Sequence, residues 1–270
     1  MRVRILTAVV SIPLFLGLLY VGKWPLFALV AGMGLIGFYE YARMWRSKQV
    51  HVPLALGAPV LLALYAWAFL APASSALLGA VAAAAVIGVM IWLVLHYGNR
   101  SVLDAAVTLF GIFYLGLFSH LLLLRGLGEG TGWDAGLRWV SLALLCTWVG
   151  DSCAYFFGIR FGKRKLAPSI SPNKSWEGAI AGGVSTVLAG SLWAPVVGAA
   201  AWQTALVAAG AFCLSVLGDL TESALKRYAG VKDSGKLLPG HGGMLDRFDS
   251  SLFVWPFVYY VAIFLFQRGL

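Results

Sequence analysis

The stretch SALLGAVAAAAVIGVMIWLVL, residues 75–95, decides the kind of fold, because its 21 residues include no charged side chain. A bilayer core about 30 Å thick is crossed by roughly 20 apolar residues in an α-helix. The rest of the chain is similar: 60% of its 270 residues are hydrophobic, 11% are charged, and the mean hydropathy is +0.85. Since soluble domains carry roughly 25% charged residues, the composition predicts an integral membrane protein and excludes a cytosolic enzyme or a secreted disulfide scaffold.

Eight further apolar runs, bounded by charged residues, Gly or Pro, raise the prediction to nine transmembrane helices. The nine runs are 5–21, 25–39, 52–70, 75–95, 103–124, 138–157, 178–198, 202–220 and 251–267. The sequence contains no internal repeat and no low-complexity linker, so we expect residues 1–270 to form a single all-α, multi-pass membrane domain. Residues 1–145 are expected to be mainly scaffold helices. Residues 146–270 are expected to be the catalytic half, with cytoplasmic loops at 158–177 and 221–250.

The basic residues are divided unequally between the two sides that nine crossings create. Sixteen of the 20 Lys and Arg residues fall on the side of the N-terminus, and four fall on the other side: Lys23, Arg125, Arg138 and Arg268. Cytoplasmic loops of membrane proteins are enriched in Lys and Arg. The asymmetry predicts a cytoplasmic N-terminus. It also explains the formal net charge of +9 as a topology signal, so no nucleic-acid partner is expected.

Polar residues interrupt the apolar pattern around the loop at 158–177. Asp151 lies within an apolar run, where an ionisable residue usually faces a cavity or a partner; an interfacial Asp at a helix end is the alternative. Ser171 and Lys174 lie between two prolines and the start of the next helix. Hydroxyls, Lys and the N–H groups of a helix N-terminus together suit a phosphate. The alternative for this loop is a basic, topogenic segment near anionic lipid.

The most polar segment, residues 219–249, contains five acids and five bases. Asp219, Glu222, Ser223 and Lys226 have spacings of three, one and three, which places them on one face of a helix leaving the membrane. The alternative is a solvated helix with salt bridges, but that alternative does not explain an Asp within the apolar face before it. After a glycine-rich turn, Asp246 follows within the same segment.

Carboxylates beside basic residues and a glycine-rich turn suit a metal–phosphate site. Mg²⁺ prefers oxygen ligands and completes its shell with water and substrate phosphates. Phosphoryl and nucleotidyl transfer depend mainly on positioning and charge neutralisation. A second metal ion would be natural if Asp219, Asp246 and Asp249 converge.

The run from residue 223 to residue 249 closely resembles the signature of phosphatidate cytidylyltransferases, also called CDP-diacylglycerol synthases. The residues that match in register are Ser223, Leu225, Lys226, Arg227, Lys232, Asp233, Gly235, Leu238, Pro239, His241, Gly242, Gly243, Met244, Asp246, Arg247 and Asp249. The stretch 147–178 also looks like this family, which often has Thr where this chain has Ser175. The resemblance covers about 147–250, and the first half of the chain resembles the family only in its hydropathy.

This resemblance implies that the chain transfers CMP from CTP to phosphatidate, with Mg²⁺ as cofactor, for phospholipid biosynthesis. The lipid phosphate would attack the α-phosphorus of CTP directly, forming CDP-diacylglycerol and pyrophosphate. The implied metal ligands are Asp219 and Asp246, with Asp249 and Asp151 as second choices. The implied catalytic residues are Asp219, Asp246, Lys226 and Arg247. The implied substrate-binding residues are Ser171, Lys174, Ser223, Arg227, Lys232, Lys236, His241, Gly242 and Gly243.

CTP is soluble and highly charged, whereas phosphatidate is held in the leaflet by its chains. We therefore expect the active site at the cytoplasmic face of the plasma (inner) membrane, and a homodimer is compatible with this arrangement. Two alternatives stay open: a membrane transporter of an anionic substrate, for which no inverted repeat is found, and a transferase acting on another lipid phosphate. His241 is interpreted either as a phosphate donor or as a turn residue.

Overall fold

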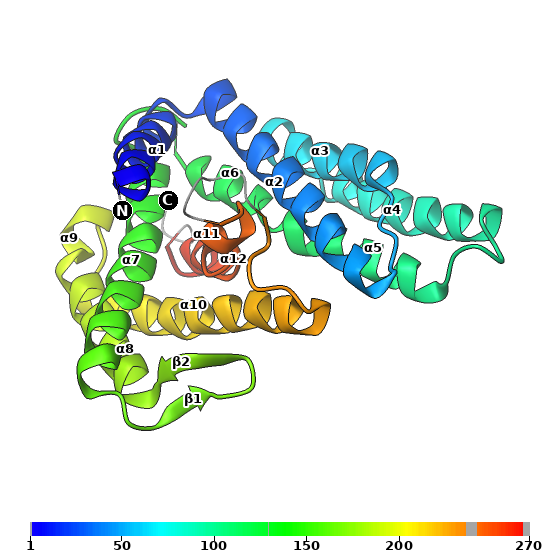
Figure 1. Cartoon of the computed structure of the whole chain (residues 1–270). Coiled ribbons are helices and arrows are strands. Elements are labelled where there is room, and N and C mark those ends of the chain that lie inside the picture. Colours follow the sequence, from blue (N-terminus) through cyan, green and yellow to red (C-terminus); the bar gives the residue numbers. More distant parts are fainter. Residues whose placement is uncertain (1, 129, 236–241, 267–270) are drawn as a thin grey trace.

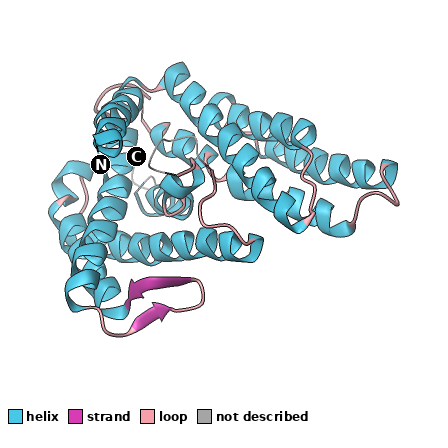
Figure 2. Ribbon diagram, in the orientation of Figure 1, coloured by secondary structure: helices cyan, strands magenta, loops and turns pink. Residues whose placement is uncertain are grey.

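The computed structural model describes residues 2–128, 130–235 and 242–266, and most of these residues are helical (Figures 1 and 2). The first half contains α1 Arg2–Val21, α2 Lys23–Trp45, the short η1 Arg46–Lys48, α3 Leu54–Leu70, α4 Ser75–Leu95, α5 Val102–Gly116 and α6 Ser119–Arg125. The second half contains α7 Ala135–Phe161, β1 Lys165–Ala167, β2 Ser171–Ser175, α8 Trp176–Leu192, α9 Ala194–Val197, α10 Ala201–Ala229, α11 Leu245–Phe248, α12 Ser251–Val261 and η2 Ala262–Phe266.

Several of these helices are long and apolar enough to cross a membrane, which confirms the coarse prediction. Among the described residues, the helical segments that meet both conditions are Lys23–Lys48, Ser75–Leu95, Val102–Arg125, Ala135–Phe161 and Ala201–Ala229. Shorter apolar helices cover Val9–Val21, Leu54–Leu70 and Ser251–Phe264. Each of the nine predicted apolar ranges contains helix, and nine crossings stay a prediction.

Two of the predicted spans are broken rather than continuous helices. The run 103–124 divides into α5 and α6 at Leu117 and Phe118. The run 178–198 divides into α8 and the short α9, with Pro195 in the first positions of α9. Proline fits there because its missing N–H would lack an intrahelical partner at a helix start anyway.

The structure adds a small sheet to the expected all-α architecture, within the predicted loop 158–177. Strands β1 and β2 form an antiparallel hairpin in which Lys165 pairs with Ser175 and Ala167 with Ser171. The hairpin leads directly into α8, whose N-cap is Ser175: its hydroxyl accepts a hydrogen bond from the backbone N–H of Gly178 at 3.2 Å. The loop is therefore an ordered element at the start of a helix.

The helices form two groups that meet around α6, α11 and α12 (Figure 1). Helices α2 to α5 pack on one another on one side, and α7, α8 and α10 pack on one another on the other side. Aromatic side chains fill the junction, where Phe118, Phe248 and Trp255 contact one another. Helix α10 continues past the predicted end at residue 220 to Ala229, so its polar C-terminal part projects beyond the apolar section.

Candidate active site

The polar face predicted for residues 219–226 is present on α10. The hydroxyl of Ser223 donates a hydrogen bond to Asp219 Oδ1 at 3.3 Å, and Lys226 forms an ion pair with Glu222 one turn before it. Glu222 is buried, although it lies near the C-terminal end of a helix that projects from the core. The four residues therefore share one face, as their spacing predicted, and this face is turned toward protein rather than toward solvent alone.

The β-hairpin is fastened to this face of α10 at two points. Lys174 Nζ lies 2.6 Å from Asp219 Oδ2, and Arg227 Nε donates a hydrogen bond to the carbonyl of Ile170 at 3.2 Å. Ile170 belongs to the turn between the strands, and Lys174 stands near the end of β2. The predicted substrate residue Lys174 is thus brought from β2 to the helix that carries the predicted residue Arg227, and Ser171, at the start of β2, is half-buried.

Asp246 accepts hydrogen bonds on both of its carboxylate oxygens. Oδ1 lies 2.6 Å from Lys226 Nζ, and Oδ2 accepts from the backbone N–H of Ser234 at 3.0 Å, the Ser234 hydroxyl at 2.9 Å and the N–H of Gly243 at 2.8 Å. Burial opposes ionisation, but the hydrogen bonds from Lys226 and Gly243 outweigh it and hold the pKa of Asp246 below its usual value. Asp246 is therefore a fixed, ionised carboxylate.

Gly242 is required by the backbone beside Asp246. Its φ of +84° lies in the left-handed region, which glycine adopts without steric cost. A Cβ atom at this position would also lie 2.7 Å from Asp246 Oδ2. The glycines of the signature therefore let the backbone wrap closely around the carboxylate.

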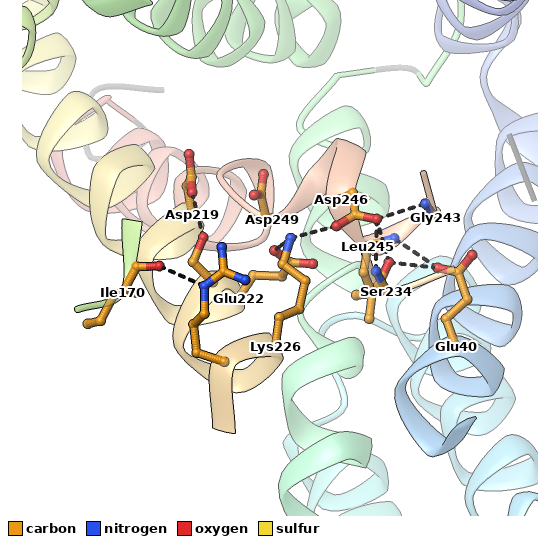
Figure 3. A network of polar contacts seen from close by, with 12 residues as sticks. Glu40, Ile170, Asp219, Glu222, Lys226, Ser234, Gly243, Leu245, Asp246 and Asp249 are labelled. Carbon is orange, nitrogen blue, oxygen red and sulfur yellow. Dashed lines mark hydrogen bonds and ion pairs between the residues drawn. The ribbon is translucent and has the colours of Figure 1, made fainter. Parts of the chain in front are cut away.

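Asp249 lies near two other carboxylates, and the structure shows no ion pair between Asp249 and a described lysine. Its Oδ1 accepts the N–H of Ser250 at 2.7 Å. Burial, followed by the negative charges of Asp219 and Asp151, raises the pKa of Asp249 above its usual value. Figure 3 shows Asp219 and Asp249 on one side of Lys226 and Asp246 on the other. The carboxylates from α7, α10 and the α11–α12 junction thus concentrate negative charge at one place.

The other four predicted site residues are either exposed or outside the described part of the chain. Lys232 and Arg247 are exposed. Lys236 and His241 lie outside the described residues, so their predicted roles in binding phosphate stay predictions.

Sequence reasoning missed two buried acids of this region, Glu222 and Glu40. Glu222 was recognised as part of the polar face but not as a site residue, although it pairs with Lys226. Glu40 lies on α2, far away in sequence, and its Oε2 accepts the backbone N–H of Leu245 at 3.2 Å (Figure 3). The signal that could have found Glu40 is a single acid directly after the apolar run 25–39, because an acid within a membrane helix is costly and usually functional.

The carboxylates offer the ligand type that Mg²⁺ prefers, but they do not form a closed metal cage. Among the residues that the structure describes, no group of three or more Asp, Glu, His or Cys side chains is arranged to hold a metal ion. Asp219 and Asp246 each hold a lysine ammonium at 2.6 Å, so the positions in front of them accept a cation. Oxygen ligands from one or two carboxylates fit Mg²⁺, which takes its other ligands from water and phosphate.

Comparison with known proteins identifies the family of this chain. A model described as the cytidylyltransferase family matches residues 2–265. The phosphatidate cytidylyltransferase of Bacillus subtilis is 38% identical to this chain, covering 97% of each protein. The proteins of the same name from Staphylococcus haemolyticus and Synechocystis are 36% and 33% identical, covering 95% and 97% of this chain and 96% of each relative. The similarity extends beyond the signature to the scaffold helices, and the chain belongs to the cytidylyltransferase family.

Proposed function

We propose that this chain is a phosphatidate cytidylyltransferase, which converts CTP and phosphatidate into CDP-diacylglycerol and pyrophosphate. An oxygen of the phosphatidate phosphate attacks the α-phosphorus of CTP, and the bond between the α-phosphorus and the bridging oxygen to the β-phosphate breaks. Pyrophosphate leaves with the electron pair of that bond. The observation that carries the proposal is the pair of carboxylate–ammonium contacts at one face of α10, Asp219 with Lys174 and Asp246 with Lys226. It is made in a chain that is similar over 97% of its length to an enzyme of this name.

The residues of this chain bind and orient the charged groups of both substrates. Lys226 of α10 and Lys174 of β2 both contact carboxylates at one face of α10. Arg227 follows Lys226 on α10, and Arg247 follows Asp246 on α11. Such cations hold the triphosphate and neutralise the charge that develops during transfer. The backbone around Gly243 keeps Asp246 ionised and fixed, so the carboxylate does not need to reorganise during the reaction.

Asp219 and Asp246 are the residues that would hold Mg²⁺, with Asp249 and Asp151 in supporting positions. When bound, this ion supplies neutralisation of the charge on the departing pyrophosphate. The ammonium groups of Lys174 and Lys226 now lie against the same two carboxylates. We expect both lysines to shift toward substrate phosphates when the carboxylates are engaged.

The activity is tested with the purified full-length protein in lipid vesicles, supplied with labelled CTP and phosphatidate. We expect labelled CDP-diacylglycerol and pyrophosphate in equal amounts, with Mg²⁺ and not with a chelator. A panel of other lipid phosphates, including a polyprenyl phosphate, identifies the alternative transferase if one of these is the better acceptor. Flux of an anion across the vesicles without any CDP-lipid would support the transporter instead and overturn the proposal.

The proposed orientation is nine crossings of the plasma membrane, with the N-terminus and the active site on the cytoplasmic face. The supports are the helices in all nine apolar ranges and the excess of Lys and Arg on one side. An impermeant amine reagent added outside intact cells is expected to label Lys23 but not Lys174. The opposite labelling would overturn the orientation.

A further inference from the structure

Glu40 connects helix α2 to Ser234 and Leu245, two residues that lie next to Asp246. It lies on α2 and is only 4% exposed. Its Oε2 accepts the backbone N–H of Leu245 at 3.2 Å and lies 3.4 Å from the hydroxyl of Ser234. The same hydroxyl lies 2.9 Å from Asp246 Oδ2. Because a serine hydroxyl has one proton to donate, Glu40 and Asp246 share a single donor.

The carboxyl group of Glu40 packs so closely against two glycines that neither position has room for a side chain. A Cβ atom on Gly235 would lie 2.2 Å from Glu40 Oε1, and a Cβ atom on Gly243 would lie 2.5 Å from Glu40 Oε2. Both glycines belong to the segment that holds Asp246. The carboxyl group of Glu40 therefore packs directly against the backbone of Gly235 and Gly243.

Packing alone does not explain a glutamate at position 40. Its Oε1 is buried without a hydrogen-bond partner among the described residues. An unsatisfied buried polar atom is destabilising, and an apolar residue of similar size would not have this cost. Asp104 is the useful contrast. It is buried to the same degree in the same half of the chain, yet hydrogen bonds satisfy both of its oxygens.

We propose that Glu40 is a positioning residue, which fixes Asp246 for cation and phosphate binding by anchoring Ser234 and Leu245 to α2. This role rests on the proposed function, because it assumes that Asp246 belongs to the catalytic site. Glu40 acts through the residues it anchors, as the outer partners of metal ligands do, whose loss typically reduces metal affinity or activity about 10–100-fold. The first half of the chain thereby contributes a residue to the chemistry of the second half.

The test compares three variants of the full-length protein: Glu40→Ala, Glu40→Gln and the matched control Asp104→Asn. The glutamine carbonyl can still accept the hydrogen bonds of Leu245 and Ser234, so Glu40→Gln should retain most activity. Glu40→Ala should raise the Mg²⁺ concentration for half-maximal activity about tenfold or more, at unchanged KM for phosphatidate. The control Asp104→Asn should leave this Mg²⁺ concentration unchanged.

A second measurement does not depend on activity. Hydrogen exchange of the metal-free protein reports how firmly residues 242–249 are held, and Glu40→Ala should speed exchange there about tenfold while α7 and α8 keep wild-type rates. Glu40→Gln should restore slow exchange. If the wild type makes no CDP-lipid but these exchange rates behave as expected, the proposed function fails and the anchoring role of Glu40 stands alone.

Three results would overturn the proposal: unchanged exchange and unchanged Mg²⁺ dependence in Glu40→Ala, loss in Glu40→Gln equal to that in Glu40→Ala, or the same Mg²⁺ shift in Asp104→Asn. If Glu40→Ala does not fold, Glu40→Asp replaces it. This variant keeps the charge but withdraws the carboxylate by one methylene from Leu245. It should show the same changes to a smaller degree, and wild-type behaviour in Glu40→Asp would also contradict positioning.

Discussion

Arg125 and Lys226 are both largely buried cations, yet the groups around them are arranged in opposite ways. Arg125 is 1% exposed, and its guanidinium donates to Asp134 at 2.6 Å and to the carbonyls of Leu19 at 2.7 Å and Gly132 at 3.0 Å. One charged partner and several backbone carbonyls thus satisfy it. Lys226 instead lies between two carboxylates, those of Glu222 and Asp246.

The difference distinguishes a cation that joins segments of the fold, Arg125, from one that is placed to bind substrate phosphate, Lys226. Arg125 joins the end of α1 to the loop before α7, and its hydrogen bonds leave little capacity for a ligand. Around Lys226 two carboxyl groups face a single ammonium, and Glu40 Oε1 has no hydrogen-bond partner among the described residues. Buried polar groups that are incompletely satisfied deserve a functional explanation. The following predictions test this contrast, from the largest effect to the smallest.

Removing the charge of Asp246 should abolish turnover without removing the fold. Asp246→Asn, and separately Asp219→Asn, is expected to lower kcat at least about 100-fold, because each variant loses a carboxylate that would hold the Mg²⁺ needed to neutralise the departing pyrophosphate. The measurement is CDP-diacylglycerol formation at saturating CTP, with membrane insertion checked in parallel. Near-wild-type activity in both variants would show that neither carboxylate holds the metal.

Removing Arg125 should lower the stability of the fold and leave kcat unchanged. Arg125→Met leaves the half-buried Asp134 without its charged partner, and we expect a cost near the lower end of the roughly 3–5 kcal/mol that breaking a fully buried pair incurs. We expect a lower thermal midpoint in detergent and unchanged kcat per folded molecule. The control is Arg160→Met, which removes an exposed arginine at the end of α7 and should leave both quantities unchanged. A large loss of kcat in folded Arg125→Met would break the contrast.

Neutralising Lys174 should weaken nucleotide binding by an intermediate amount. Lys174 is only partly buried against Asp219, so Lys174→Gln is expected to raise the KM for CTP about tenfold, or about 1.4 kcal/mol. The matched control is Lys165→Gln, on the other strand of the same hairpin. Equal effects of the two variants would indicate a general electrostatic attraction rather than a defined contact.

Acid should reduce the stability that the Arg125–Asp134 ion pair contributes, because it protonates Asp134. Burial opposes ionisation of Asp134, but the hydrogen bonds from Arg125 and from the N–H of Leu137 lower its pKa below the ordinary value of 3.8. A carboxyl with a depressed pKa contributes stability above the pKa of the unfolded chain, and this contribution disappears as the pH falls through the folded pKa. Thermal midpoints measured from pH 6 downward should therefore fall below about pH 4 in the wild type, and less in Asp134→Asn.

The spacing of the sequence predicted those parts of the site that lie on one helix. The face of α10 with Asp219 and Lys226 followed from helical periodicity, and the glycine-rich turn before Asp246 was evident from the sequence, whereas the close packing of Gly242 on Asp246 was not. The hairpin at Lys165–Ser175 was not predicted, because its strands are short and one contains a proline. The contact of Glu40 with Leu245 joins residues 205 positions apart. Periodicity within one helix contains no information about which distant segment packs on it.

Helix α10 runs without a break from Ala201 to Ala229 and carries both Asp219 and Lys226. At 1.5 Å per residue, these two positions are separated by about 10 Å along the axis, and inserting one residue between them would rotate Lys226 by about 100°. We expect a continuous helix of this kind to fix the distance between the two contact points for a substrate's charged groups. A substrate whose phosphates are spaced differently would then fit poorly because of distance alone.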